Sequence, residues 1–212
     1  MKIAIRLAII FKFAFLLICV PKQLCAQQSQ VASQQQEMTF QVFQYSDDFS
    51  PARFAMIADG LITPRTPHRF KAAARSLPPG SIIYLNSDGG SLLPALALGM
   101  NIHEHRLTTF VLSGAKCTSA CAYAFLGGKT RKVFPGAFIG LHRFYSRDFP
   151  SSTQEFQNEQ KVARDIVEIL NGYIVSVNGD PGLVALAQLV NPNEMLYLDS
   201  LDLLRLGVAT EP

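Results

Sequence analysis

The chain has 212 residues, of which 49% are apolar, and a formal charge of +3 at pH 7. A chain of this length and apolar content can bury its own core, so we expect one folded domain and exclude a wholly disordered protein. Four of the 19 basic residues and none of the 16 acidic residues lie within residues 1–26, so 15 basic residues face 16 acidic ones in the remainder. This near-neutral balance gives no electrostatic reason to expect a nucleic acid as partner.

Residues 1–26 have the pattern of a secretory signal peptide. Two basic residues precede an apolar run, and Ala26 is the small residue that cleavage requires. Cleavage after Ala32 and retention of the segment as an anchor are the alternatives. The uninterrupted apolar part, 13–20, is shorter than the roughly 20 residues that a spanning helix needs. We therefore expect no membrane span in the mature chain and a periplasmic or secreted location.

A tether and the first elements of a domain follow the predicted leader. Residues 27–37, QQSQVASQQQE, hold almost nothing to bury and predict a flexible linker, which leaves 38–212 as a single α/β domain. The alternation in 38–45, MTFQVFQY, predicts a strand. Residues 50–61, SPARFAMIADGL, predict a helix, with serine as its cap and proline in its first turn.

Two units of strand, tight loop and helix come next. Residues 78–105 combine a turn signal, a β-branched run, a glycine pair and a helical apolar pattern. Residues 107–128 repeat this order, with a loop of small residues in place of the glycine pair. RKVFP at 131–135 and AFIGLHRF at 137–144 predict a third pair of strands without a helix between them.

The C-terminal third is predicted to be mainly helical. Apolar residues recur at helical spacing over 156–177, and Asn178-Gly179 ends that helix. A short helix is expected around 182–190, and a capped helix from Asp199 to Leu206. Strands that alternate with helices indicate an α/β fold with a largely parallel sheet.

Two loops and one strand end hold the groups that acyl transfer needs. Ser119 lies where a strand-ending loop becomes a helix, so the N–H of Ala120 has no partner within that helix and is free to bind an oxyanion. Gly89 and Gly90 expose backbone that can supply a second donor. His142 ends an apolar strand and is the candidate base for the serine hydroxyl.

Removal of the leader leaves two cysteines, Cys117 and Cys121, on either side of Ser119. An exported chain with two thiols usually pairs them, and a spacing of four is feasible where a turn leads into a helix. Two reduced, buried side chains are the alternative, and Cys117 as the nucleophile is a further option. Two thiols without a nearby histidine make a poor zinc site, so we expect no metal.

These motifs also resemble a known family. From about Ser81 to Gly207 the chain resembles the Clp-type serine protease superfamily, relatives of crotonase, and most closely the exported bacterial Clp-protease-like proteins. IYLNSDGGSL is similar to the family's glycine loop, GAKCTSACAYAFLGGKTR to its nucleophile loop and helix, and AFIGLHRF to its histidine strand. The resemblance implies a Clp/crotonase fold of repeated β-β-α units, with a largely parallel sheet and a projecting helix after Ser151.

The resemblance also implies roles for individual residues and assembly into a homo-oligomer. Where the family's proteases place an aspartate before the last helix, this chain reads VNPNEMLYLDS from residue 190. An asparagine there can orient an imidazole but cannot stabilise its charged form. The implied roles are Ser119 as nucleophile, His142 as base, Gly89 and Ala120 as oxyanion donors, Gly90 as the residue that shapes the loop, and Asn193 as third triad member, with Asn191 and Glu194 as alternatives.

We therefore expect an exported serine hydrolase that acts on a peptide or protein substrate without a cofactor. A non-catalytic Clp-like module that binds peptides or partner proteins in the same groove is the alternative, because the triad is incomplete. A crotonase-like enzyme acting on acyl thioesters is a third interpretation, since it needs the glycine N–H donors and not the serine.

Overall fold

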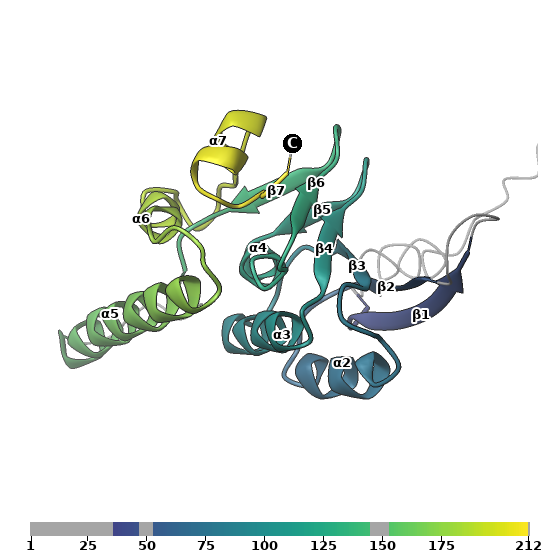
Figure 1. The fold of residues 1–212 in the computed structure, drawn as a ribbon. Helices are drawn as coiled ribbons and strands as arrows, with labels where there is room; N and C mark the ends of the chain where they lie inside the picture. The colour runs from purple at the N-terminus through teal and green to yellow at the C-terminus, as the bar shows by residue number, and fades with distance from the viewer. Residues whose placement is uncertain (1–35, 47–52, 145–152, 212) are drawn as a thin grey trace, which may run out of the picture. The chain divides into compact units, whose positions relative to one another are not determined.

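The structure is a computed structural model that describes residues 36–46, 53–144 and 153–211. The predicted signal peptide lies outside the described residues, as does the predicted linker except for its last two residues. The described part is a mixed α/β fold with two sheets and six helices (Figure 1).

The secondary-structure elements follow one another in a mixed order along the chain. The strands are β1 (Thr39–Tyr45), β2 (Arg53–Asp59), β3 (Ile82–Asn86), β4 (Thr108–Val111), β5 (Lys116–Thr118), β6 (Arg131–Val133), β7 (Phe138–Leu141) and β8 (Leu196–Tyr197). The helices are α2 (Thr66–Ala74), α3 (Leu92–Glu104), α4 (Ala120–Phe125), α5 (Thr153–Ser176), α6 (Gly182–Gln188) and α7 (Ser200–Arg205).

The larger sheet has the strand order β1-β2-β3-β4-β6. Only the β1–β2 pair is antiparallel, so the predicted α/β fold with a largely parallel sheet is confirmed. Helices α2, α3 and α4 cover one face of this sheet (Figure 1), where Met56, Ile83 and Val111 are fully buried. The Thr109 hydroxyl, on that face, donates a 2.8 Å hydrogen bond to the carbonyl of Phe125 in α4.

The prediction of a helix over 50–61 is wrong, because its described residues form β2. Met56 and Ala58 are fully buried whereas Ile57 between them is 40% exposed, which is the alternation of a strand. β2 lies between β1 and β3, whose backbones supply its hydrogen bonds, and this tertiary pairing overrides the local signal. The first described helix begins later, at Thr66.

The smaller sheet has the order β5-β7-β8 and contains the strands that surround the candidate site. β5 forms within the loop of small residues that the sequence predicted between β4 and α4, and it runs parallel to β7. The strands predicted at 131–135 and 137–144 both form, but they do not pair with each other. β6 joins the larger sheet and β7 the smaller one, and the turn between them contains Gly136 at φ 79°.

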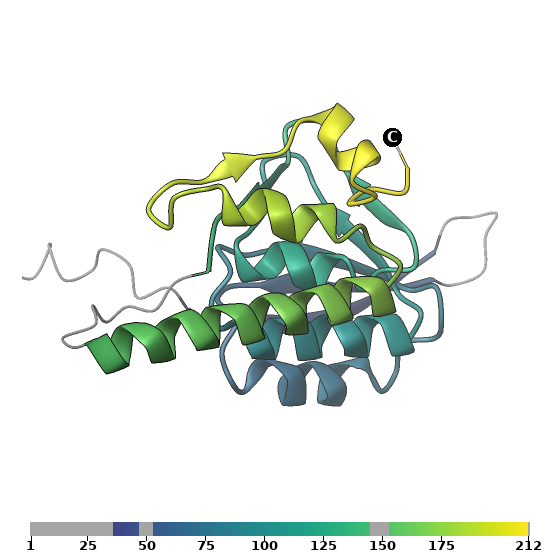
Figure 2. The same ribbon diagram turned by 90° about the vertical axis from the view of Figure 1, so that its left-hand side faces the viewer.

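Helix α5 packs against the rest of the fold by its C-terminal turns. Leu170 and Ile174 are fully buried, and the Tyr173 hydroxyl donates a 2.7 Å hydrogen bond to the carbonyl of Tyr123 in α4. Gly99 of α3 makes room for that tyrosine, because a Cβ at Gly99 would lie 1.9 Å from its hydroxyl oxygen. The N-terminal half of α5 runs past the ends of α3 and α4 (Figure 2). No helix in the described ranges has both the length and the apolar character needed to cross a bilayer.

Carboxylate side chains form hydrogen bonds near both ends of the described chain. Near the start, the Glu37 carboxylate accepts hydrogen bonds from the Thr63 hydroxyl and from the guanidinium groups of Arg65 and Arg69. These contacts, that of Thr63 foremost, hold the pKa of Glu37 below its usual value. Near the end, the Asp199 carboxylate caps α7 by accepting a 2.8 Å hydrogen bond from Asp202 N–H, as predicted for this helix.

Candidate active site

Ser119 lies between β5 and α4 in an unusual backbone conformation. Its φ of 54° and ψ of −126° are rarely adopted by side chains other than glycine, and such a conformation costs about 1–3 kcal/mol. Two backbone hydrogen bonds maintain it: Ser119 N–H donates to the carbonyl of Gly140 at 2.8 Å, and the Ser119 carbonyl accepts from Ala122 N–H at 3.1 Å. Strained residues of this kind cluster at functional sites.

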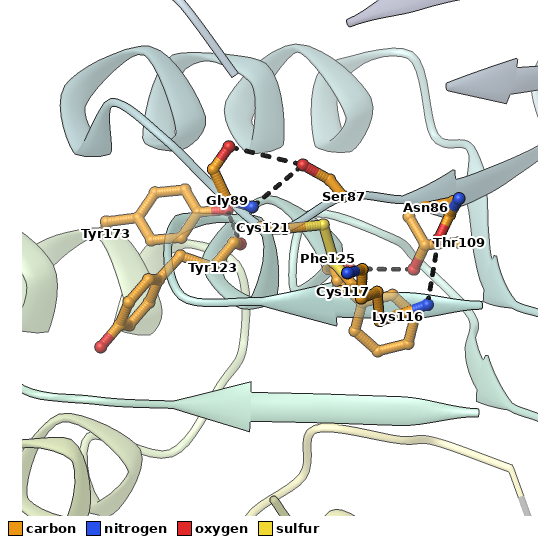
Figure 3. Close-up of a disulfide and its surroundings, with 10 residues drawn as sticks. All are labelled: Asn86, Ser87, Gly89, Thr109, Lys116, Cys117, Cys121, Tyr123, Phe125 and Tyr173. Atoms are coloured by element: carbon orange, nitrogen blue, oxygen red, sulfur yellow. Dashed lines mark hydrogen bonds between the residues drawn. A yellow bond between two sulfur atoms is a disulfide. The ribbon is translucent and has the colours of Figure 1, made fainter. Parts of the chain in front are cut away.

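A disulfide brackets this serine, as one of the two sequence interpretations predicted. Cys117 in β5 and Cys121 in α4 are joined, with their α-carbons 5.0 Å apart, and both side chains are fully buried (Figure 3). The bridge ties the strand before Ser119 to the helix after it. The predicted disulfide is therefore confirmed, and Cys117 is not a free thiol.

The structure brings His142 to Ser119 although 23 residues separate them in the chain. The Nε2 atom of His142 lies 2.7 Å from Ser119 Oγ, and Nδ1 lies 2.9 Å from the carbonyl oxygen of Arg143. A carbonyl can only accept, so the imidazole proton resides on Nδ1. Nε2 then carries the lone pair and accepts the hydrogen bond from the serine hydroxyl, which is the tautomer that a general base requires.

The two glycines after β3 allow the loop to lie directly against the serine. Gly89 and Gly90 have φ values of 100° and 129°, which favour glycine. A Cβ at Gly89 would lie 2.8 Å from the Cβ of Ser119 and 3.0 Å from the nitrogen of Ala120. A Cβ at Gly90 would lie 2.2 Å from the carbonyl oxygen of Ile62. Neither position can carry a side chain without displacing backbone.

The amide groups of this loop differ from the sequence expectation in one respect. Gly89 N–H, expected as an oxyanion donor, donates to Ser87 Oγ at 3.1 Å. The carbonyl of Gly89 accepts a 2.8 Å hydrogen bond from Ile62 N–H, so the N–H of Gly90, on the opposite side of the same trans peptide, points away from Ile62. Within the described ranges, the N–H groups of Gly90 and Ala120 have no hydrogen-bond partner.

Ser87 ties the glycine loop to the serine loop. Its backbone N–H donates to the carbonyl of Lys116 at 2.7 Å, and its carbonyl accepts from Thr118 N–H at 3.0 Å. The side chain of Ser87 is buried and bonds to both backbone groups of Gly89, as Figure 3 shows. Next to it, Asn86 accepts a 3.1 Å hydrogen bond from Lys116 N–H. These hydrogen bonds hold the C-terminal end of β3 against β5, next to the loops that form the site.

Asn193, the expected third triad member, lies in a turn near the histidine strand. Its N–H donates to Asn191 Oδ1 at 3.1 Å, and Glu194 N–H donates to the carbonyl of Asn191 at 2.9 Å. None of the described hydrogen bonds of Asn193 reaches the imidazole of His142. The structure instead gives Nδ1 of His142 a backbone carbonyl as its acceptor.

The register of β7 and β8 indicates which residue lies across from His142. β7 and β8 pair Gly140 with Tyr197 and Leu141 with Leu196, so the next residues along the two strands are His142 and Met195. The Met195 side chain lies over Gly140, where an added Cβ would be 2.8 Å from both its Cγ and its Sδ. Extension of this register places Met195 opposite His142 at the ends of the two strands.

The sequence analysis did not assign a role to Ser87 or Met195. An ST-turn signal, a serine two residues before a glycine, was present for Ser87 but is common in loops. Met195 can be recognised only from the pairing of two strands that lie more than 50 residues apart in the chain.

The arrangement brings together a hydroxyl, an imidazole within hydrogen-bond distance of it, and two amide groups without a hydrogen-bond partner among the described residues. No three His, Cys, Asp or Glu side chains in the described part of the chain are grouped so as to hold a metal ion. Comparisons of the chain with protein-family models and with curated proteins gave no match.

Proposed function

We propose that this chain is a serine hydrolase of the Clp/crotonase fold, which cleaves acyl bonds of a peptide or protein substrate with a Ser119–His142 pair and no cofactor. The observation that carries the proposal is the 2.7 Å contact between Ser119 Oγ and His142 Nε2, together with the Arg143 carbonyl that holds the proton on Nδ1. The succession of glycine loop, serine loop and histidine strand around one point supports the choice of fold.

In the first half-reaction, Ser119 Oγ attacks the substrate carbonyl carbon while its proton passes to His142 Nε2. The carbonyl π electrons move to the oxygen, whose negative charge is stabilised by the free N–H groups of Gly90 and Ala120. Collapse of this intermediate breaks the bond to the leaving amine, which takes the proton from Nε2. The products are an acyl ester of Ser119 and a released amine.

In the second half-reaction, water replaces the amine. His142 Nε2 removes a proton from the water as it attacks the ester carbonyl, and the same two amide groups bind the oxyanion. The Ser119–acyl bond then breaks, and the serine oxygen regains the proton from Nε2. The protonated imidazole that forms twice in the cycle lies beside the Arg143 carbonyl, whose dipole stabilises it.

The second candidate function is a peptide- or protein-binding module without catalysis. Met195 favours it, because its side chain lies over Gly140, two residues before His142, and adds apolar surface to which a peptide side chain can bind. The strained backbone of Ser119 favours the hydrolase, because a binding module has no need to hold a serine at a positive φ.

We also propose that the protein acts outside the cytoplasm and forms a homo-oligomer. The disulfide supports the first point, because disulfides persist in oxidising compartments. Helix α5 supports the second, because Val162, Ile169 and Val175 are each about half exposed or more along it.

A fluorophosphonate probe tests the proposed function on the exported, oxidised protein. The probe forms a covalent bond only with an activated serine, so we expect labelling of the wild-type chain at Ser119, located by peptide mass measurement. The Ser119→Ala variant is the matched control and should not be labelled. The folded wild-type protein remaining unlabelled at long times would favour the binding module, and labelling that persists in Ser119→Ala would place the nucleophile elsewhere.

A further inference from the structure

The smaller sheet has one buried face and one face that reaches solvent. Cys117, Ile139 and Leu141 alternate along β5 and β7 and are fully buried. The residues between them face the other way. In an amphipathic sheet, these outward positions should be polar.

Two aromatic side chains occupy the outward face instead. Phe138 in β7 is 50% exposed and Tyr197 in β8 is 56% exposed. Their rings meet edge to face, with centroids 5.7 Å apart. A cluster of exposed apolar rings on the solvent face of a sheet is a candidate contact surface for another molecule.

This face leads along the strands to the candidate nucleophile and base. Alternate residues of a strand face the same side, so Phe138 and Gly140 lie on one side of β7, and His142 is the next residue in this alternation. At about 3.3 Å per residue, Phe138 lies about 13 Å before His142 along the strand. The aromatic pair and the Ser119–His142 pair thus lie on one continuous surface.

The residues between the two pairs are mainly apolar. Gly140 has no side chain, and Met195 lies over it with the Thr118 methyl group beside it. Met195 is partly buried, whereas Thr118 and Gly140 are buried. Lys116, which pairs with Phe138 in the register of β5 and β7, places its ammonium group 2.6 Å from Asp88, the residue before Gly89. The apolar strip therefore has the catalytic groups at one end and this ion pair along the side of the glycine loop.

We propose that the surface formed by Phe138, Tyr197 and Met195 is a substrate subsite for a large apolar side chain, aromatic above all, two to four residues from the cleaved bond. The inference rests on the proposed function and adds to it a substrate class. The occupant is the substrate because the strip continues into the Ser119–His142 pair. In an extended peptide, side chains point the same way every two residues, about 7 Å, which is also the spacing between Met195 and Tyr197 along their strand. An aromatic side chain there makes edge-to-face contact with both rings.

Hydrolysis of short peptide amides tests the subsite. The substrates are acetylated tetrapeptide coumarin amides that are identical except for one residue, Phe or Gly, placed two or three positions before the cleaved bond. We expect the wild-type enzyme to prefer Phe over Gly in kcat/KM by about tenfold or more. In the double variant Phe138→Ser/Tyr197→Ser this ratio should fall close to one.

A matched control separates this effect from a general loss of exposed apolar residues. Leu93 and Leu189 are 58% and 83% exposed on other elements, so Leu93→Ser/Leu189→Ser removes a similar exposed area and should keep the ratio of the wild-type enzyme. Circular dichroism and the melting temperature establish that both double variants fold.

Peptide binding to Ser119→Ala distinguishes failure of the subsite from failure of the hydrolase. If no substrate is cleaved, fluorescence anisotropy of the labelled peptides still measures whether Ser119→Ala binds the Phe peptide more tightly than the Gly peptide. Loss of this preference when Phe138→Ser/Tyr197→Ser is added supports the subsite. An unchanged preference in that background overturns it. If the double variant instead dissociates an oligomer by light scattering while the preference stays, the aromatic pair is a subunit contact and the inference is wrong.

Discussion

Ser119 Oγ and His142 Nε2 lie 2.7 Å apart, with the serine backbone held at a φ of 54° to present its hydroxyl to the imidazole. A general base contributes about 10²–10⁴-fold to such a reaction. We therefore expect His142→Ala to lower kcat at least about 10²-fold with little change in KM. Ester or amide turnover under saturating substrate measures this.

Because the two residues act as one unit, their effects should not add. The double variant Ser119→Ala/His142→Ala is expected to be about as slow as Ser119→Ala alone. Losses that multiply in the double variant would show that the two side chains act separately.

The disulfide should matter for both stability and catalysis. Closing a loop of five residues contributes about 2 kcal/mol to the free energy of unfolding in the chain-entropy model, so Cys117→Ala/Cys121→Ala should lose about that amount in urea. Without the bridge, β5 and α4 are free to relax the strained Ser119 backbone, so fluorophosphonate labelling should slow as well. A variant that loses stability but is labelled at the wild-type rate would show that the bridge does not position the serine.

Ser87→Ala should weaken oxyanion binding without removing a donor. The Ser87 hydroxyl bonds to both backbone groups of Gly89, and its loss leaves the hydrogen bond from Ile62 N–H to hold the Gly89–Gly90 peptide, which should be less rigid. Removal of an oxyanion donor costs about 10²–10³-fold in kcat, so we expect a smaller loss of about tenfold with KM unchanged.

Ser91→Ala is the control for Ser87→Ala. Ser91 precedes α3 in the same loop, and its side chain makes no capping hydrogen bond. The Ser91 variant should keep the wild-type kcat. If both variants lose activity equally, the loop depends on serine in general and not on the Ser87 contact with Gly89.

Acid should destabilise the fold in part through Glu37. The folded state holds the pKa of this carboxyl below 4.5, first through the Thr63 hydroxyl and then through Arg65. Its contribution to stability is therefore present above about pH 4.5 and is lost as the pH falls through the lowered value. Urea unfolding of wild type and Glu37→Gln from about pH 7 to about pH 3 should give curves that differ at neutral pH and converge in acid. Parallel curves would contradict this role.

The chemistry-bearing residues could be named from local patterns. The glycine pair, the serine between two cysteines and the histidine at a strand end each follow from a few neighbouring residues, because turns, helix starts and strand ends are set by short-range backbone preferences. The disulfide and the helices α5, α6 and α7 were predicted on the same basis.

The features that the sequence predicted wrongly or did not reveal depend on hydrogen bonds between segments far apart in the chain. β2 reads as a helix until β1 and β3 supply partners on both sides of it. The same holds for the Gly89–Gly90 peptide, because the hydrogen bond from Ile62 N–H to the Gly89 carbonyl orients it. The contact of Gly89 N–H with Ser87 is local, but its sequence signal is common in loops.

Residue types and their immediate neighbours were enough to predict which side chains are candidates for catalysis, because each candidate lies in a recognisable turn, helix start or strand end. Their surroundings depend on the tertiary fold: the pairing of β7 with β8 extends to Met195 opposite His142 and brings Phe138 into contact with Tyr197. The physical reason is that strand register is set by hydrogen bonds between segments far apart in the chain, and a shift of one residue reverses every side chain, so no local pattern encodes it.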